Sequence, residues 1–342
     1  MGQKLLTWTY SYALLDSPPE NLTLFVRFGS MWKSELQFIR VCSHFSEESN
    51  MKALSVKIMP AKAICFLSAI LISGFACAED PTWSAPHAPY QITDNIYAVG
   101  TEGIGVYLIT TPKGHILLDA STEQGAAVVE ANIKTLGFKL TDIKYLIENH
   151  AHSDHVGGMA KLKAATKAKL IASKADRYAL ETGKLDGETL GWDDKFPPVM
   201  VDRAVNDGEK ISLGGVSLRA LLTPGHTKGC TSWLTESEDK GVKRRVIFAC
   251  SLTVADNRLI NNKVYPTIVD DFRSTFARLK NVKADILLVG HPGFANLEEK
   301  RIAKEKGKAD AFVDPQLLQT FVVKAEAAFE EELKKQQAQQ PK

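Results

Sequence analysis

The segment His150 to His155, with the sequence HAHSDH, contains three of the eight histidines of the chain and an aspartate. His150 and His152 are two residues apart, so in an extended segment their side chains point the same way and can bind one cation. The turn that follows can direct Asp154 and His155 toward a second cation. The sequence therefore predicts a metal site, to which the fold must bring further ligands.

Length and composition place this site in an ordinary globular protein. The chain has 342 residues, of which 44% are hydrophobic and 24% charged, enough to bury a full core. The formal net charge is only +2, and the sequence has neither a basic run nor interleaved aromatic residues. These features argue against nucleic acid or an anionic membrane surface as a partner, so we expect a small-molecule substrate.

Residues 51–78 have the features of a secretory signal peptide. Three lysines precede an apolar stretch from Ala63 to Phe75, and Ala76-Cys77-Ala78 fits the small-x-small rule for cleavage. The apolar stretch is too short to span a bilayer comfortably, so we expect export to the periplasm and no stable membrane insertion after cleavage. Lipid attachment at Cys77 is the alternative, which the poor lipobox Gly74-Phe75-Ala76 disfavours.

Residues 1–50 precede this signal, although a secretory signal must be N-terminal to work. We therefore interpret Met51 as the true start and residues 1–50 as a mis-assigned start. A genuine extension, of undetermined order, is the alternative. Residues 79–342 then form a single domain.

The predicted mature chain keeps two cysteines, Cys230 and Cys250. Strand-like TSWLT and VIFAC flank the polar segment ESEDKGVKRR, which predicts a hairpin with its turn around residues 239–241. If the hairpin centres on Lys240, Cys230 lies opposite Cys250, at a separation that permits a disulfide. Two buried free thiols are the alternative, because a slip of one residue would remove the opposition.

Strand-like and helical patterns alternate along the mature chain without a repeat. Strands are expected at 105–111, 115–120, 144–148, 168–172, near 211–222, 231–235, 246–250 and 285–290. Helices are expected at 123–136, 156–167, 269–280 and from an N-cap at Asp314, with Pro315 at the first position, to about Gln336. The mixture predicts an α/β fold with substantial antiparallel pairing.

Polar residues follow four of these apolar strands. Asn149-His150 follows KYLIE, Gly225-His226 follows ALLTP, Ser251 follows VIFAC and Gly290-His291 follows DILLV. Open α/β sheets bind their ligands outside the carboxyl ends of the strands. We therefore expect the four loops to converge on one cleft.

These motifs resemble the metal-binding loops of the metallo-β-lactamase superfamily over nearly all of the mature chain. The matching segments are HAHSDH, GHT at 225–227, GHP at 290–292, LLDAS at 117–121 and TPGHTKGCTSW at 223–233. Subclass B3 of the metallo-β-lactamases is similar in finer detail, through the GTE segment at 100–102 and the PPV-x-x-DR segment at 197–203. The resemblance implies the αββα four-layer sandwich of the metallo-β-lactamase fold.

The resemblance also implies two Zn²⁺ ions per chain. The first zinc would be bound by His150, His152 and His226, with an open position for water or hydroxide. Asp154, His155 and His291 would bind the second zinc. A zinc-bound hydroxide would attack the lactam carbonyl, the second zinc would stabilise charge on the departing nitrogen, and Asp154 would have a catalytic role in orienting the nucleophile.

Position 251 separates branches of this superfamily. Glyoxalase II and many lactonases carry a metal-bridging aspartate in a GDT-like segment, whereas this chain has Cys250-Ser251-Leu252-Thr253. Ser251 and Thr253 lie two apart and resemble the hydroxyl pair that contacts the substrate carboxylate in subclass B3. In subclass B1 a cysteine is a ligand at the position of Ser251, but Cys250 would point to the opposite face of the strand.

Each of these residues also has a purely structural interpretation. Asp154 can cap the following helix, His291 can be an ordinary loop residue, and Ser251 and Thr253 can be ordinary strand-end hydroxyls. Asp119 either organises the ligand loops by hydrogen bonding or stabilises a turn. Four aromatic residues either line the mouth of the cleft or pack inside the protein, and three histidines are assigned no site role. The aromatic residues are Trp83, Tyr90, Trp192 and Phe196, and the histidines are His44, His87 and His115.

The sequence thus leads to one functional hypothesis and two alternatives. We predict an exported, monomeric zinc hydrolase that opens the β-lactam ring of penicillins, cephalosporins and carbapenems and thereby confers antibiotic resistance. A hydrolase of this fold acting on another ester, lactone or thioester is the first alternative. A non-catalytic periplasmic zinc-binding protein is the second.

Overall fold

The computed structural model describes residues 80–190 and 194–339, and these lie in one compact unit, Phe75–Lys342. The expected mis-assigned start at 1–50, the signal peptide at 51–78, Cys77, His44 and Trp192 lie outside the described residues. Within the described ranges, no helix is both long and apolar enough to cross a membrane.

Two mixed β-sheets form the centre of this unit. The first sheet has the order β1 (Tyr90–Thr93), β2 (Ile96–Ala98), β3 (Tyr107–Thr111), β4 (Gly114–Leu118), β5 (Ile143–Ile147), β6 (Lys169–Ser173) and β7 (Arg203–Val205). The second has the order β12 (Ile286–Val289), β11 (Val242–Ala249), β10 (Thr231–Asp239), β9 (Val216–Leu222) and β8 (Lys210–Leu213). Strands β4 to β7 pair in parallel, as do β11 and β12, and the other pairs are antiparallel.

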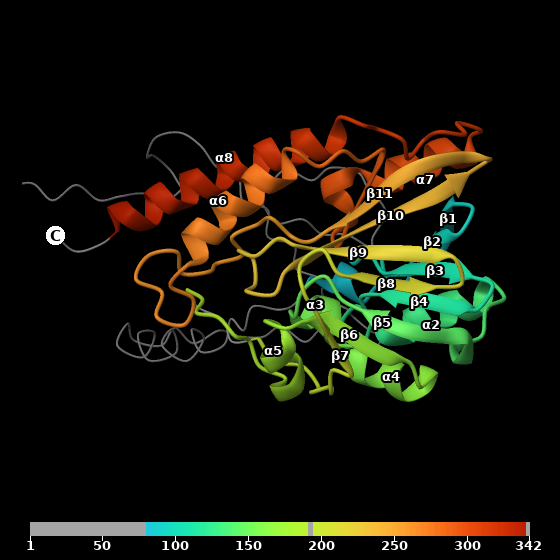
Figure 1. Cartoon of the computed structure of the whole chain (residues 1–342), viewed down its shortest axis with the longest axis horizontal. Coiled ribbons are helices and arrows are strands. Elements are labelled where there is room, and N and C mark those ends of the chain that lie inside the picture. Colours follow the sequence, from blue (N-terminus) through green and yellow to red (C-terminus); the bar gives the residue numbers. More distant parts are fainter. Residues whose placement is uncertain (1–79, 191–193, 340–342) are drawn as a thin grey trace, which may run out of the picture. The chain divides into compact units, whose positions relative to one another are not determined.

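Helices cover the outer face of each sheet, as Figure 1 shows. The helices are α2 (Ala126–Thr135), α3 (Ser153–Val156), α4 (Met159–Thr166), α5 (Arg177–Thr182), α6 (Ile268–Leu279), α7 (Leu297–Glu305) and α8 (Leu317–Ala338). Helices α2 and α4 lie on the first sheet, and α6 and α8 lie on the second. The predicted αββα sandwich is confirmed.

The alternation of side chains along the central strands explains this layering. On β3 and β4, Leu108 and Leu117 join a buried cluster with α2 and α4, whereas Ile109 and Ile116 join the cluster between the sheets. Successive strand residues point to opposite faces, so a strand buried on both faces is apolar throughout. Trp233, fully buried on β10, contributes to the inter-sheet cluster from the second sheet.

The helix predicted at 156–167 is divided into α3 and α4, and it starts three residues earlier than expected. The break falls at Gly157 and Gly158. A Cβ atom at Gly158 would lie 2.5 Å from the Ala120 carbonyl oxygen, and one at Gly157 would lie 2.4 Å from that of Ser153. Both close contacts require glycine, and the one at Gly158 lets the segment that begins with His152 pack against the residues that follow β4.

The cysteine hairpin differs from the prediction in its length and register. Strands β10 and β11 continue through the polar segment to a two-residue turn at Lys240-Gly241, where both residues have positive φ. Trp233 pairs with Phe248, so the register is one residue away from the predicted one. The turn has two central residues, Lys240 and Gly241, and this shifts the pairing by one position.

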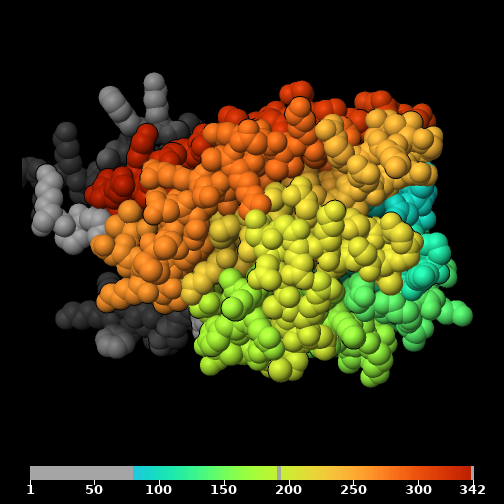
Figure 2. All heavy atoms as spheres, in the orientation of Figure 1, coloured from blue at the N-terminus to red at the C-terminus, as the bar shows by residue number. Residues whose placement is uncertain are grey.

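Other elements depart less from the prediction. Helix α8 begins at Leu317 rather than at Pro315, and Asp314 Oδ1 accepts a hydrogen bond from the Gln316 N–H, 3.1 Å away. The short strands β1, β2 and β7 and the short helices α5 and α7 were not predicted, because few residues carry their periodicity. In Figure 2, orange residues of the region of α6 lie above yellow residues of the region of β9, so the second half of the chain covers much of this face.

Candidate metal centre

The loops that follow β5, β9, β11 and β12 meet at one edge of the sandwich. Asn149 ties two of them together, because its side-chain amide donates to the Thr231 carbonyl at 2.8 Å and its own carbonyl accepts from the Thr231 N–H at 2.7 Å. The parallel direction of β11 and β12 brings Ser251 and His291 to the same edge. The expected convergence of the four loops is therefore present, at the carboxyl ends of the strands.

Three histidines form the first donor group. His150, His152 and His226 are buried, and their ring nitrogens lie close enough to hold one metal ion. The Nε2 atoms of His150 and His226 are 3.1 Å apart, and their ring planes are nearly perpendicular, at 86°. Two nitrogens of this kind can both direct a lone pair to a point between them.

An aspartate and two histidines form the second donor group. Asp154 Oδ2 lies 3.2 Å from His155 Nε2 and 3.2 Å from His291 Nε2, and the two nitrogens are 3.4 Å apart. The three atoms therefore make a nearly equilateral triangle. His155 also lies beside His150, with ring centroids 4.3 Å apart, so the two groups are neighbours.

Both groups fit zinc. Histidine and carboxylate donors sit about 2.0–2.1 Å from zinc, which at a tetrahedral angle separates two donors by about 3.3 Å. The donor spacings of 3.1 to 3.4 Å match this value. Nitrogen and carboxylate oxygen are also the ligand atoms that zinc takes in catalytic sites.

The protonation states of His150, His226 and Asp154 favour metal binding. Burial, together with repulsion from neighbouring histidines, holds the pKa of His150 and of His226 well below the usual value, so both rings stay neutral. Burial alone would raise the pKa of Asp154, but His155 and His291 outweigh it and hold that pKa well below its ordinary range. Neutral imidazoles and an ionised carboxylate are the forms that bind metal.

Hydrogen bonds from outside the triads orient two ligands. His226 Nδ1 donates to the Thr253 carbonyl at 2.8 Å, which leaves Nε2 free to face His150. His155 Nδ1 lies 3.4 Å from Asp119 Oδ2, and Asp119 Oδ1 accepts from the Asn149 N–H at 2.8 Å. Asp119 is fully buried with φ of 65°, so it occupies a turn after β4 and also holds the ligand loop that follows β5 at Asn149 and His155.

The sequence reasoning missed Asp176, which connects the two loops of the first group. Its carboxylate accepts from the Ala151 N–H at 3.2 Å, the Thr227 hydroxyl at 3.1 Å and the Gly229 N–H at 3.1 Å. Burial raises the pKa of Asp176 to about 6. The sequence did contain a signal for this residue, because Asp176 follows β6 in the same way that the ligands follow the other strands.

The two hydroxyls at the end of β11 lie together. Ser251 Oγ and Thr253 Oγ1 are 3.1 Å apart, and Ser251 lines a pocket with His150, His155 and His291. Thr253 also contacts His226, with 3.4 Å between Oγ1 and Nδ1. Both hydroxyls are half-buried, which leaves them open to a ligand as well as to the protein.

Cys230 and Cys250 are joined in a disulfide, with 5.9 Å between Cα atoms. The one-residue shift in register does not separate the two cysteines, because the regular pairing of β10 with β11 ends at Trp233 and Phe248, before the cysteines are reached. Beyond that point the Cys250 N–H bonds to the Ser232 hydroxyl at 3.0 Å instead of to the opposite backbone. A disulfide sulfur has no thiolate, so Cys250 is not a metal ligand in this state.

The aromatic candidates have different positions. Trp83 is half-buried with its ring 5.8 Å from that of His291, so it borders the site. Tyr90 stacks on Phe312 at 6.0 Å, and Phe196 is 7% exposed within the cluster under α2 and α4, so both are packing residues. Two histidines without a predicted site role lie elsewhere: His87 pairs with Glu298, and His115 packs on Phe138.

Residues 100–291 match the family model described as the metallo-beta-lactamase superfamily. The curated relatives include a hydroxyacylglutathione hydrolase of Methylococcus capsulatus, 30% identical over 39% of this chain and 43% of the relative. They also include a beta-lactamase-like protein 2 homolog of Caenorhabditis elegans, 24% identical over 56% of each chain. The matches thus span about half the length of these relatives.

Solved structures match over a larger part of both chains. BJP-1, a subclass B3 metallo-beta-lactamase of Bradyrhizobium japonicum, is 44% identical, with a TM-score of 0.73 over 75% of this chain and 98% of its own. A metallo-beta-lactamase of Cronobacter sakazakii is 42% identical over 75% and 98%, with a TM-score of 0.71. FEZ-1 of Legionella gormanii is 34% identical over 74% and 98%, with a TM-score of 0.70.

Proposed function

The chain belongs to the metallo-beta-lactamase superfamily, and on that premise we propose that it hydrolyses the β-lactam amide bond of penicillins, cephalosporins and carbapenems with two zinc ions. The observation that carries this proposal is the pair of adjacent donor triads with Ser251, and not a bridging carboxylate, at the end of β11. The likeness to structures titled as subclass B3 enzymes supports it.

Each part of the site has a task in this reaction. Bound zinc would supply a water-derived nucleophile at neutral pH and positive charge near the developing negative charge. Asp154 stays ionised, so it can accept a hydrogen bond from the attacking water and orient it. Ser251 and Thr253 would donate hydrogen bonds to the substrate carboxylate. Thr253, Asp119 and Asp176 hold the ligand loops in place.

A carbapenem assay tests the proposal. We expect the zinc-loaded protein to open a carbapenem ring, to lose this activity with a chelator and to regain it with zinc. Retained zinc with no turnover of a penicillin, a cephalosporin or a carbapenem would instead favour a non-catalytic zinc-binding protein.

Asp154→Ala gives a second test of the site. Removing this carboxylate takes away a ligand and the group that orients water, so turnover should fall by more than about 100-fold. Circular dichroism should stay close to that of the wild type, since the residue lies in the single-turn helix α3 at the edge of the sandwich. Near-normal turnover would contradict the assigned role.

A thioesterase is the second candidate function, because several curated relatives are named hydroxyacylglutathione hydrolases. A hydroxyacyl-glutathione thioester offers the same zinc site a carbonyl to attack. Turnover of this thioester, or of a lactone, without turnover of any β-lactam would favour this alternative. The serine at position 251 counts against it, since it cannot replace a bridging carboxylate.

We also infer that residues 51–78 direct export to the periplasm and that residues 79–342 form the mature enzyme. The Cys230–Cys250 disulfide supports this, because structural disulfides persist mainly in oxidising compartments. Cell fractionation with mass spectrometry of the N-terminus should find a protein that begins at Glu79. A cytoplasmic protein that retains residues 51–78 would contradict it.

A further inference from the structure

The loop between β11 and α6 contains a strained turn. Ala255 and Asp256 both have positive φ, 48° and 56°, in the left-handed region that residues with a Cβ atom rarely adopt. Such a backbone persists only where the surrounding contacts over-determine its conformation, and it is common at functional sites. The contacts of the neighbouring residues show what this turn holds in place.

The loop holds the metal ligand His226 at two points. Asn257 is buried, and its side-chain amide donates to the His226 carbonyl at 3.0 Å and to the Val254 carbonyl at 2.7 Å. The Thr253 carbonyl, in the same loop, accepts from the His226 ring nitrogen Nδ1 at 2.8 Å. The backbone and the ring of this ligand are thus fixed by one loop, which sets the direction of Nε2.

Helix α8 fastens the loop through Gln336, a buried residue near the end of the helix. Its Nε2 donates to the Asn257 carbonyl at 3.0 Å, and its Oε1 accepts from the Leu259 N–H at 2.8 Å. The side-chain amide therefore bonds to the backbone on both sides of Arg258. Breaking either bond would leave a buried polar group unsatisfied, so the helix and the loop hold one another in place.

A second segment, residues 188–190, pairs with the same loop. The Leu190 N–H donates to the Asp256 carbonyl, and the Arg258 N–H donates to the Glu188 carbonyl, both at 2.8 Å. These two bonds flank Asn257 in the sequence. Its side chain is therefore presented to the ligand loop from a backbone that is bonded on both sides.

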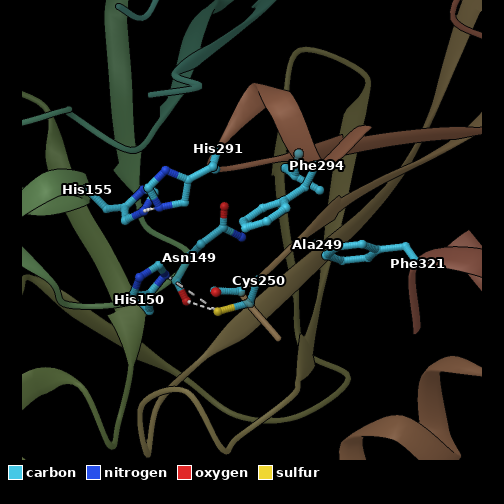
Figure 3. A pocket seen from close by; sticks show the side chains of 11 residues that line it. Asn149, His150, His155, Ala249, Cys250, His291, Phe294 and Phe321 are labelled. Atoms are coloured by element: carbon cyan, nitrogen blue, oxygen red, sulfur yellow. Dashed lines mark hydrogen bonds between the residues drawn. The ribbon is translucent and has the colours of Figure 1, made fainter. Parts of the chain in front are cut away.

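His150, the neighbour of His226 in the first donor group, is held independently. Figure 3 shows the Cys250 sulfur beside Asn149 and His150, and this sulfur lies 3.2 Å from the Asn149 carbonyl oxygen and 3.7 Å from His150 Nδ1. The bond to Cys230 keeps the sulfur in place. The 3.1 Å spacing between the Nε2 atoms of His150 and His226 therefore depends mainly on how His226 is held.

We infer that Asn257 is a positioning residue for His226 and that Gln336 supports it from helix α8. The inference rests on the two-zinc site of the proposed function, but not on the identity of the substrate. Without the support of Gln336 the strained turn can relax, and His226 Nε2 then leaves the position that suits a zinc ion shared with His150. The first zinc should be weakened selectively, because other loops carry the second donor group.

Gln336→Met tests this inference, since methionine has a similar length but makes neither hydrogen bond. The zinc concentration that half-saturates His226 should rise about 10-fold, because an outer hydrogen-bond partner of a ligand is lost. The values for His155 and His291 should stay within about 2-fold of the wild type. Zinc titration of the metal-free protein, followed by NMR of the histidine ring nitrogens, measures each ligand separately.

Gln337→Met is the matched control, with the same substitution at the next, exposed position of the helix. All three histidines should titrate in this variant as they do in the wild type. Asn257→Ala removes the amide that bonds to His226, so it should weaken zinc binding at His226 at least as much as Gln336→Met.

Three outcomes would overturn the positioning role: equal weakening at His226, His155 and His291, no change in either variant, or loss of the folded state in both. Circular dichroism before the addition of zinc detects the last of these. If the wild type takes up two zinc ions but hydrolyses no β-lactam, the proposed function fails, and the titration still decides the role of Asn257.

Discussion

Asp176 shows how one side chain can set the geometry of a site that it does not enter. Its two oxygens accept three hydrogen bonds, one from the loop of His150 and His152 and two from the loop of His226. Those loops are more than 70 residues apart in the chain, so no local preference holds them together. A buried carboxylate with several N–H and O–H donors does so at the cost of its own desolvation.

Asp176→Asn should therefore weaken zinc binding without unfolding the protein. The asparagine has the same shape, but its NH₂ group would face one of the donors, and the two ligand loops would move apart. We expect a loss of about 10-fold in zinc affinity, measured by competition with a chromophoric chelator. Asp310→Asn, at an exposed position, is the control. Equal affinities in the two variants would rule out the positioning role.

At the scale of elements, strand ends and their connections determine where the site residues lie. The disulfide joins the start of β10 to the end of β11, directly under a metal ligand, with 3.7 Å between Cys250 Sγ and His150 Nδ1. The disulfide therefore restrains two loops: the one that connects His226 to β10 and the one that connects β11 to Thr253. The two bonded cysteines are 20 residues apart in the sequence.

Removing the bridge with Cys230→Ser and Cys250→Ser together should destabilise the fold. A disulfide across a loop of this size contributes about 3 kcal/mol, chiefly through the entropy of the unfolded chain. We expect the free energy of unfolding in urea to fall by about that amount. The oxidised and reduced wild type should differ by a similar value, and coincident unfolding curves would show that the bridge has no structural effect.

Asp285 connects the parallel strands β11 and β12 at the end opposite the disulfide. Its carboxylate accepts hydrogen bonds from the Arg245 N–H at 2.8 Å and from the guanidinium at 2.6 and 3.0 Å. These bonds hold the pKa of Asp285 below its ordinary value. A carboxylate with a lowered folded-state pKa stabilises the fold above its unfolded-state pKa, and this stabilisation disappears as the pH falls.

Asp285→Asn should consequently destabilise the protein in a pH-dependent way. Because Arg245 is half exposed, we expect a loss of about 1 kcal/mol in the free energy of unfolding at pH 7, and this loss should become smaller as the pH falls below the ordinary pKa of an aspartate. Denaturation at several pH values measures this, with Glu331→Gln, at an exposed position, as the control. A loss that is independent of pH would show that the ionised carboxylate does not contribute.

At the scale of the whole molecule, the proposed metal centre lies where the two halves of the sandwich meet. His150, His152, Asp154 and His155 follow a strand of the first sheet, whereas His226 and His291 follow strands of the second. Each donor group thus includes ligands from both sheets. Metal binding should therefore stabilise the packing of one sheet on the other.

Zinc removal should lower the stability of the entire fold. A ligand at 100 times its dissociation constant adds about 2.7 kcal/mol to the free energy of unfolding when only the folded state binds it. Thermal melting with chelator and after addition of zinc should show this difference, and magnesium should not restore the loss. Identical melting temperatures with and without zinc would contradict a site shared by the sheets.

Much of the fold was predictable because its signals are local. The apolar segments at 105–111 and 115–120 predicted β3 and β4, and the helix that became α6 was placed within one residue at each end. The break between α3 and α4 was not predictable, because it depends on close contacts of Gly157 and Gly158. The one-residue shift of the long hairpin followed from a turn whose centre the sequence left open.

The sequence by itself determined the kinds of ligand atoms, the loops that carry them and the α/β class of the fold, since these depend on residue type, spacing and short-range periodicity. The four-layer sandwich followed only from the resemblance to a known superfamily. Only the tertiary structure decided that His291 lies 3.2 Å from Asp154 and that Asp176 bridges two loops. Such contacts join residues far apart in the chain. They depend on strand order and on packing between sheets, which no local pattern encodes.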